Sequence, residues 1–183
     1  MKIEVVRANL VKQPDIEAVV NSANANLRLG SGVAGSIHSA AGPKLEEYCK
    51  PFAPLAYGGY LVTPGFKLPN LWVIHVRAAS YTNHAEAPAV LRQALEVMLR
   101  AANDNDIRSL AFPAIGTGVF AFPSALAAEI TASVLIRADD LAPHLQLVRL
   151  CVVDSDLHAH YKSAFAAAGL VVSCFSPETN LPV

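Results

Sequence analysis

The sequence predicts an α/β domain, with a largely parallel sheet and helices on both faces. Short apolar segments alternate with segments of helical periodicity along almost the whole of the 183 residues. The apolar segments are continuous instead of alternating with polar residues, which is typical of strands that are buried on both faces. No period of 20–50 residues repeats, and no linker divides the chain. We therefore expect a single domain over residues 1–183, with residues 169–183 as a C-terminal tail.

Six segments are expected to form the strands of this sheet. They are residues 2–7, 18–20, 59–63, 71–77, 109–112 and 147–153. Each combines apolar and β-branched residues over a short length, and prolines or glycines lie between them. Pro113 ends the fifth segment, and residues 64–70 carry two prolines and are expected to form a loop. Residues 170–175 show a weaker strand pattern.

Five segments have the pattern of helices, namely residues 32–41, 43–49, 87–103, 124–141 and 156–168. The third is the clearest, because its apolar residues recur at helical spacing. The pair Gly42-Pro43 separates the first two, and Gly169 ends the last. Ser124 is expected to cap the fourth helix. Lys44, Glu46 and Glu47 are expected on a solvated helix face.

The composition narrows the class of protein. The chain is 53% hydrophobic and 16% charged, so it can bury a substantial core. A net charge of −1 argues against a basic groove for nucleic acid. No apolar run reaches the ~18 residues needed to span a bilayer, and the N-terminus lacks a signal-peptide pattern. Three widely spaced cysteines indicate a reducing, cytoplasmic compartment and no metal site.

The stretch from Ala18 to Gly42 carries the first candidate site. A short strand leads through a turn with three asparagines, two of them Asn21 and Asn24, into the glycine loop Gly30-Ser31-Gly32 and then a helix. Such a loop directs several backbone N–H groups at one point, and the helix dipole adds partial positive charge there. The arrangement suits a phosphate group, so no cofactor or metal is required.

A second glycine loop follows the strand at residues 109–112. Its centre is Gly116-Thr117-Gly118, and Phe120 and Phe122 come shortly after. Because ligands in parallel sheets bind at the carboxyl ends of strands, the two loops could hold a diphosphate between them. Either phenylalanine could form an apolar wall against a sugar, although a core position is the more frequent role.

Two other interpretations of the first loop remain open. Residues 30–35 match G-x-G-x-x-G, the fingerprint of nicotinamide-dependent enzymes with a dinucleotide-binding fold. Nine residues separate its first glycine from the strand, however, and no carboxylate closes the next strand about 20 residues on. Alternatively, the glycines serve only helix packing.

Three segments together resemble the macro domain family, which binds ADP-ribose. They are VVNSAN, the following GVAGSIHSAAGP and the later FPAIGTGVFAFP. The resemblance implies a three-layer α/β/α sandwich with a central mixed, mostly parallel sheet of about six strands. It also implies that ADP-ribose, or an ADP-ribosylated protein or metabolite, binds in a cleft between the two loops.

The resemblance assigns roles to individual positions. Asn24 would bind the distal ribose, and Asn21 would shape the same turn or touch the ribose indirectly; both are catalytic candidates. The first phosphate loop would comprise Gly30, Ser31, Gly32, Val33 and Ala34. The second would comprise Ala114, Ile115, Gly116, Thr117, Gly118, Val119 and Phe120, with Phe120 against the distal ribose. Asn9, Leu10 and Val153 would surround the adenine.

Several positions depart from the family pattern. Asn9 replaces an Asp that accepts a hydrogen bond from adenine, and Val153 replaces a stacking aromatic residue, so both adenine contacts are weakened. Ser31 replaces a glycine, which is costly if that position has a positive φ. Gly116 stands where a hydroxyl residue is frequent. Ala34 replaces the Asp of one hydrolase branch, which removes the most obvious general base.

The expected activity is therefore hydrolysis of an ester at the distal ribose, assisted by a phosphate of the substrate. Mono-ADP-ribosylated acidic side chains and O-acetyl-ADP-ribose are the candidate substrates. Positioning and hydrogen-bond donors would replace an acid/base pair. The alternatives are a binding module without turnover and a module for another phosphorylated nucleoside. His38 could serve as a base, although a structural histidine is favoured because no orienting partner is evident.

Overall fold

The computed structural model describes residues 1–173, and its centre is a seven-stranded sheet. The strands are β1 (Lys2–Arg7), β2 (Ala18–Ser22), β3 (Tyr60–Pro64), β4 (Trp72–Val76), β5 (Ser109–Pro113), β6 (Leu147–Val152) and β7 (Val172–Ser173). Their order is β3-β4-β2-β5-β6-β1-β7, and β3 is antiparallel to its neighbour while the other pairs are parallel. The mixed, mostly parallel sheet is thus confirmed. It has one strand more than expected, because the short β7 pairs with β1 at the edge.

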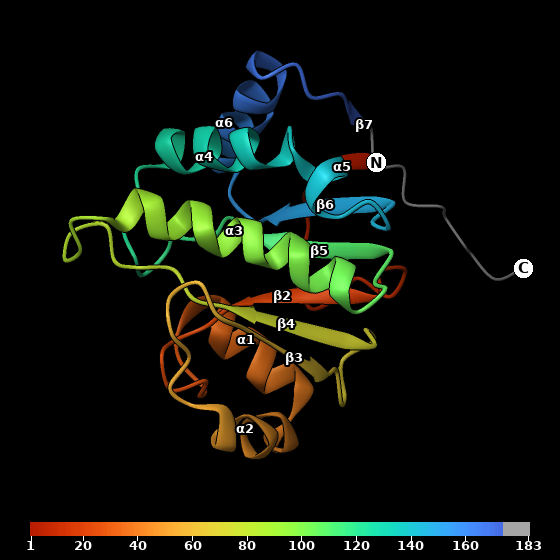
Figure 1. Cartoon of the computed structure of the whole chain (residues 1–183), viewed down its shortest axis with the longest axis vertical. Coiled ribbons are helices and arrows are strands. Elements are labelled where there is room, and N and C mark those ends of the chain that lie inside the picture. Colours follow the sequence, from red (N-terminus) through yellow and green to blue (C-terminus); the bar gives the residue numbers. More distant parts are fainter. Residues whose placement is uncertain (174–183) are drawn as a thin grey trace, which may run out of the picture.

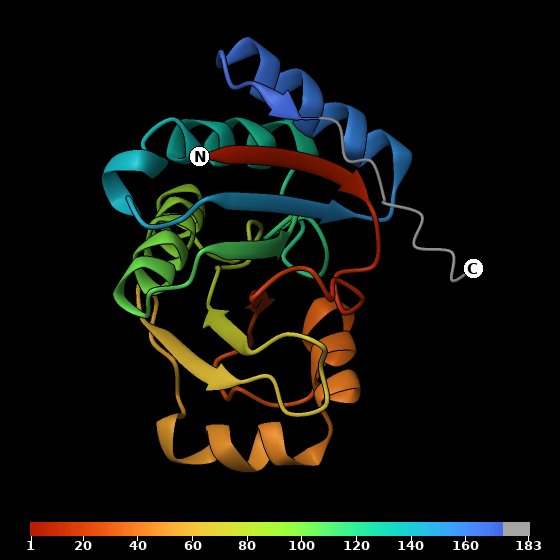
Figure 2. The same ribbon diagram turned by 90° about the vertical axis from the view of Figure 1, so that its right-hand side faces the viewer.

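Helices cover both faces of this sheet. They are α1 (Gly32–Ala41), α2 (Pro43–Cys49), α3 (Ala87–Asp104), α4 (Ser124–Leu135), α5 (Ala138–Leu141) and α6 (Ser155–Ala167), with the 3-10 helix η1 at Lys50–Phe52. Helix α3 crosses one face together with α4 and α6, whereas α1 and α2 pack against the other (Figures 1 and 2). The three-layer α/β/α arrangement is confirmed.

Strand β2 shows why the sheet segments are continuously apolar. Ala18 and Val20 belong to the core under α3, while Val19 belongs to the core under α1. All three side chains are fully buried. A strand at the centre of a three-layer sandwich has no solvent-facing side, so the alternation expected of a half-exposed strand does not arise.

The segment 124–141 differs from the prediction, since it forms two helices instead of one. Helix α4 ends at Leu135, and the Arg137 N–H turns back to the Val134 carbonyl at 3.0 Å before α5 begins. Ile136 at this break is exposed. The predicted N-cap is also wrong, because Pro123 occupies that position and Ser124 is the first helical residue.

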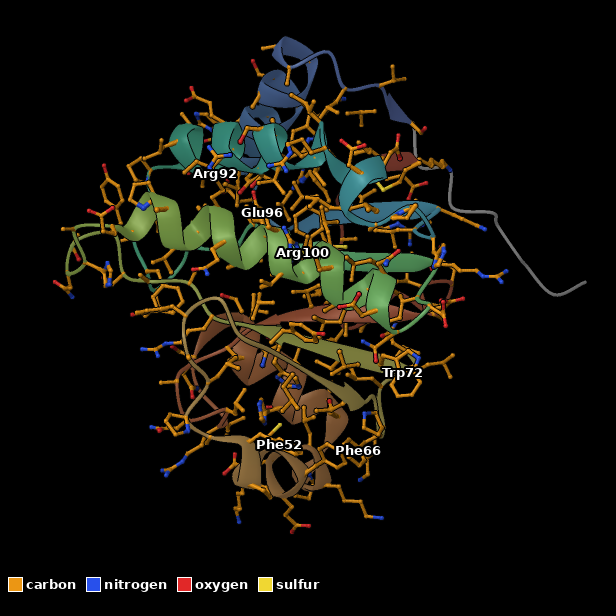
Figure 3. The ribbon with its side chains drawn as sticks, viewed as in Figure 1. Phe52, Phe66, Trp72, Arg92, Glu96 and Arg100 are labelled. Atoms are coloured by element: carbon orange, nitrogen blue, oxygen red, sulfur yellow. The ribbon has the colours of Figure 1, made fainter. Side chains whose placement is uncertain are left out.

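Side-chain contacts fix α4 against α3. Arg92 donates from Nη1 to Oγ of Ser133 at 2.7 Å, and Arg137 Nη1 lies 3.3 Å from Glu96 Oε1. Figure 3 shows Arg92, Glu96 and Arg100 along the outer side of α3.

A buried polar cluster lies between the sheet and α1. His75 on β4 accepts at Nδ1 from the Asn21 amide at 3.0 Å, and its Nε2 lies 3.2 Å from Thr63 Oγ1. Since the Asn21 Nδ2 group only donates, Nδ1 is the unprotonated nitrogen and Nε2 carries the proton. Burial lowers the pKa of His75 to about 3, with a smaller contribution from His38. The imidazole is therefore neutral and structural, as expected for a packed strand histidine.

Acidification should destabilise the fold through His75. Between about pH 6.5 and 3 the unfolded chain binds a proton at this histidine and the folded chain does not, so stability falls as the pH falls. The slope from this group alone is at most about 1.4 kcal/mol per pH unit. Urea unfolding at several pH values should show a shallower slope for His75→Gln than for the wild type. His160→Gln, at an exposed histidine, is the control and should leave the slope unchanged.

Candidate ligand-binding cleft

A cleft of about 560 Å³ opens at the carboxyl ends of β1, β2, β5 and β6. It brings together nearly all the predicted site residues from four separate segments. Those that line it are Asn9, Leu10, Asn24, Gly30, Ser31, Gly32, Val33, Ala34, Ala114, Gly116, Thr117, Gly118, Val119, Phe120 and Val153. The two glycine loops therefore lie on the same cleft, although more than 80 residues of sequence separate them.

The first loop leads directly into α1. Gly32 has φ +61°, which an L side chain adopts only with strain, so glycine is favoured there. Ser31 has φ −87° and ψ 170°, an ordinary extended conformation, so the strain expected for serine at this position is absent. No side chain caps α1, and its first N–H groups have no intrahelical acceptor. The helix thus presents free donors and its positive dipole end to the cleft.

Asn24 closes the turn that precedes this loop. Its Nδ2 donates to the Arg28 carbonyl at 2.8 Å, and its Oδ1 accepts from the Arg28 N–H at 3.1 Å. These bonds fix which end of the amide is the donor, and one N–H and one lone pair remain for a ligand. A side chain at Gly30 would start 3.1 Å from Nδ2, so it would crowd the Asn24 amide.

Glu46 anchors the same segment from α2. Its Oε2 accepts from the Leu29 N–H at 2.9 Å, immediately before Gly30. Glu46, expected on a solvated helix face, is half-buried and also makes this contact with the first loop. The contact joins α2 to the first loop and restricts the positions that the loop can take.

The second loop is held by its own backbone. The N–H groups of Ala121 and Phe122 donate to the carbonyls of Gly118 and Gly116, both at 2.9 Å, and Thr117 Oγ1 donates to the Ala114 carbonyl at 2.9 Å. Its tip reaches the first loop, because Val119 Cγ2 lies 4.0 Å from where a Gly32 Cβ would stand. These contacts fix the backbone of the loop beside the first loop.

The two phenylalanines of this segment have different roles. Phe120 lines the cleft, and its carbonyl accepts from the Tyr81 N–H at 2.8 Å. Phe122 is buried in the core and packs against Tyr81, with ring centroids 5.0 Å apart. Of the two phenylalanines that could contact a sugar, only Phe120 lines the cleft.

Two predicted residues lie behind the cleft instead of lining it. Asn21, a catalytic candidate expected to shape the turn or to touch the ribose indirectly, is fully buried, donates to His75 and does not line the cleft. Ile115 points into the core under α3. Asn21 lies near the end of β2 and Ile115 shortly after β5, where side chains alternate between the cleft and the interior, and the sequence alone does not resolve which way each one points.

The end of the cleft that contains Asn9 is otherwise apolar. Leu10, Val153 and Leu157 line it, and Val153 is 77% exposed. Asn9 Oδ1 accepts from the Val11 N–H at 3.1 Å, so Nδ2 is the donor that remains. This end can cover a flat, weakly polar group.

Seven lining residues were not predicted from the sequence. They are Ala8, Ser22, Ser36, Pro113, Cys151, Val152 and Leu157. Most adjoin predicted residues at the ends of β1, β2, β5 and β6. Ser36 stands four residues after Gly32 on α1, a helical spacing that the sequence does show.

The chemistry of the cleft is that of neutral donors. None of the described residues that line it is an Asp, Glu, His, Lys or Arg. Burial raises the pKa of the Cys151 thiol to about 12, so this cysteine is not a nucleophile at neutral pH. Backbone amides, Asn24 and the hydroxyl groups are left to bind and orient an anionic ligand.

His38 lies outside this cleft. It borders a second hollow, of about 420 Å³, between α1 and α2, and burial lowers its pKa while Glu46 opposes the shift. The alternative in which His38 acts as the base is therefore not supported. Within residues 1–173, no three His, Cys, Asp or Glu side chains are grouped to hold a metal, and no helix could cross a membrane.

Comparisons with known proteins agree with this geometry. The Macro domain profile matches residues 20–131. The O-acetyl-ADP-ribose deacetylase of Salmonella newport (strain SL254) is 40% identical over 135 residues, which cover 70% of this chain and 74% of that protein. The Oceanobacillus iheyensis macrodomain with ADP has a TM-score of 0.84 and 26% identity over 90% of each chain. The Trypanosoma brucei macrodomain in complex with ADP-ribose has a TM-score of 0.79 and 29% identity, covering 88% of this chain and 68% of that one. On its sequence and its fold, this chain belongs to the macro domain family.

Proposed function

We propose that this macro domain, taken as a single domain over residues 1–183, binds ADP-ribose or an ADP-ribosyl group in the cleft between its two glycine loops. The observation that carries the proposal is the meeting of both loops on one cleft lined by neutral donors and no carboxylate. The relatives and neighbours whose names include ADP or ADP-ribose support the same ligand class.

The ligand would lie along the cleft in three parts. The diphosphate would accept hydrogen bonds from backbone N–H groups near Gly32 and Gly118, at the positive end of α1. The distal ribose would lie between Asn24 and Phe120. The base would fill the apolar end beside Asn9 and Val153.

Catalysis would consist of hydrolysing an ester at the distal ribose. Water adds to the ester carbonyl carbon, the bond from that carbon to the ribose oxygen breaks, and the products are a carboxylic acid and the free ribose hydroxyl. A phosphate of the substrate would orient the water, because the cleft lining holds no acid or base. Asn24, fixed by Arg28, would hold the ribose for this attack.

A second candidate function is a reader that binds ADP-ribosyl groups without turnover. The observation that favours it is the same neutral lining, together with Ala34 at the start of α1. The two candidates share the ligand and differ only in product release.

Acetate release by the wild type distinguishes the hydrolase from the reader, and replacing Asn24 by alanine tests the proposed site. With O-acetyl-ADP-ribose as substrate, we expect wild-type protein to release acetate and Asn24→Ala to do so about 100-fold more slowly, since one positioned donor is lost. The exposed Asn26 of the same turn lies outside the cleft, so Asn26→Ala is the matched control and should keep wild-type activity.

Calorimetry with ADP-ribose completes this experiment. Binding of ADP-ribose without acetate release by the wild type would reject the deacetylase reaction and favour the reader. Absence of binding heat with ADP-ribose would reject both functions.

A further inference from the structure

The apolar end of the cleft is built on an irregular segment between β1 and β2. Asn9 and Leu10, which line the cleft, belong to this segment and to no helix or strand. A line of hydrogen bonds connects it to the interior of the sandwich, starting at Arg149 on β6.

Arg149 is held from two sides. Its guanidinium is 2% exposed, and Nε donates to Glu4 Oε2 at 2.6 Å. Nη1 and Nη2 donate to the two carboxylate oxygens of Asp15 at 2.9 and 2.7 Å. This hydrogen-bonded contact lowers the pKa of Asp15, so the pair stays ionised at neutral pH. The guanidinium therefore has one fixed position.

The Gln13 side chain connects Arg149 to the segment that lines the cleft. Its side-chain Oε1 accepts from Arg149 Nη1 at 2.8 Å, and because a guanidinium only donates, Nε2 must face the other way. Nε2 donates to the Asn9 carbonyl at 2.8 Å. Gln13 is 4% exposed, and its own carbonyl accepts from Asn70 Nδ2 at 2.7 Å. The amide is thus fixed at both ends.

We propose that Gln13 is a positioning residue for the base half of the ligand. It does not line the cleft and acts through Asn9, whose carbonyl it holds. This inference rests on the proposed function, since it assumes a ligand with a nucleoside at the Asn9 end. The role concerns only the nucleoside end of the ligand. Loss of Gln13 should therefore weaken the binding of a ligand that has a nucleoside and not of one that lacks it, whereas a purely structural role would affect both.

Two variants remove the hydrogen bond from Gln13 to Asn9, and the neighbouring hydrogen bonds largely remain. In Gln13→Leu the Asn9 carbonyl still accepts from the Lys12 N–H at 3.1 Å, and Arg149 Nη1 still donates to Asp15. Gln13→Glu keeps an acceptor for Arg149 and loses the donor to Asn9. Both variants should fold, and both should release the turn at Asn9.

The test compares two ligands, ADP-ribose and ribose 5-diphosphate, which is the same molecule without its nucleoside. Gln13→Leu and Gln13→Glu should each bind ADP-ribose about tenfold more weakly, and ribose 5-diphosphate within twofold of wild type. Thr131→Val removes a buried hydrogen bond on α4, from Oγ1 to the Ala127 carbonyl at 2.8 Å, and should change neither affinity.

The outcomes separate the two proposals. Unchanged binding of ADP-ribose by both Gln13 variants, or an equal loss for both ligands, would overturn the positioning role and leave the proposed function intact. Wild-type protein that binds neither compound would refute the proposed function and this inference together.

Discussion

Gly32→Glu should abolish binding of ADP-ribose while leaving the fold intact. The new carboxylate would stand at the N-terminus of α1, beside Val119 of the second loop, where the phosphates are placed. A unit charge about 4 Å from a phosphate repels it by ~4 kcal/mol at an effective dielectric constant of ~20. That energy corresponds to an affinity about 1000-fold lower. Calorimetry with ADP-ribose measures the loss, and circular dichroism checks the fold.

The control for this variant is Gly169→Glu. Gly169 has φ +76°, so glutamate there meets similar backbone strain, but no atom lies within 4 Å of its Cβ position and it is outside the cleft. Binding of ADP-ribose should remain at the wild-type level. A Gly32→Glu protein that still binds ADP-ribose with wild-type affinity would show that the first loop does not hold the phosphates.

Arg149→Met should cause the largest loss of stability. Methionine keeps much of the side-chain volume, but the buried Glu4 carboxylate loses the guanidinium group with which it pairs. Removing one member of a buried ion pair lowers the free energy of unfolding by about 3–5 kcal/mol. Lys2, whose Nζ lies 2.7 Å from Glu4 Oε1, compensates in part, so we expect a value near about 3 kcal/mol. Urea denaturation monitored by circular dichroism measures it.

Arg137→Met is the matched control. Arg137, between α4 and α5, is largely exposed, and its Nη1 lies 3.3 Å from Oε1 of Glu96 on α3. Such surface pairs contribute about 0–1 kcal/mol, so this variant should be nearly as stable as the wild type. Equal losses of unfolding free energy in Arg149→Met and Arg137→Met would contradict a larger contribution from the buried pair.

The strands and the cleft loops follow from local sequence, and the sequence therefore predicted most of them. Val19 and Val20 lie in a short apolar run, and the glycines near 30–32 and 116–118 mark the two loops that line the cleft. The break in the segment 124–141 was missed because its residues are compatible with helix throughout. It arises from the turn back to Val134, a contact that composition does not encode.

The supports of the cleft could not be predicted, because they join distant residues. Arg149 meets Gln13 across 136 positions, and Glu46 meets Leu29 across 17. The family resemblance makes Asn21 a site candidate, but its side chain turns inward to His75. Which way a strand-end side chain points depends on the pairing of β2 with β4, and that pairing is a property of the whole sheet.

The central claim is that the two glycine loops hold one diphosphate by their backbone. A crystal structure of this protein with ADP-ribose tests it most directly. We expect diphosphate oxygens within hydrogen-bond distance of N–H groups near Gly32 and Gly118, and the distal ribose on Asn24. A diphosphate bound elsewhere, or contacting only one of the loops, would show that the two loops do not form one phosphate site.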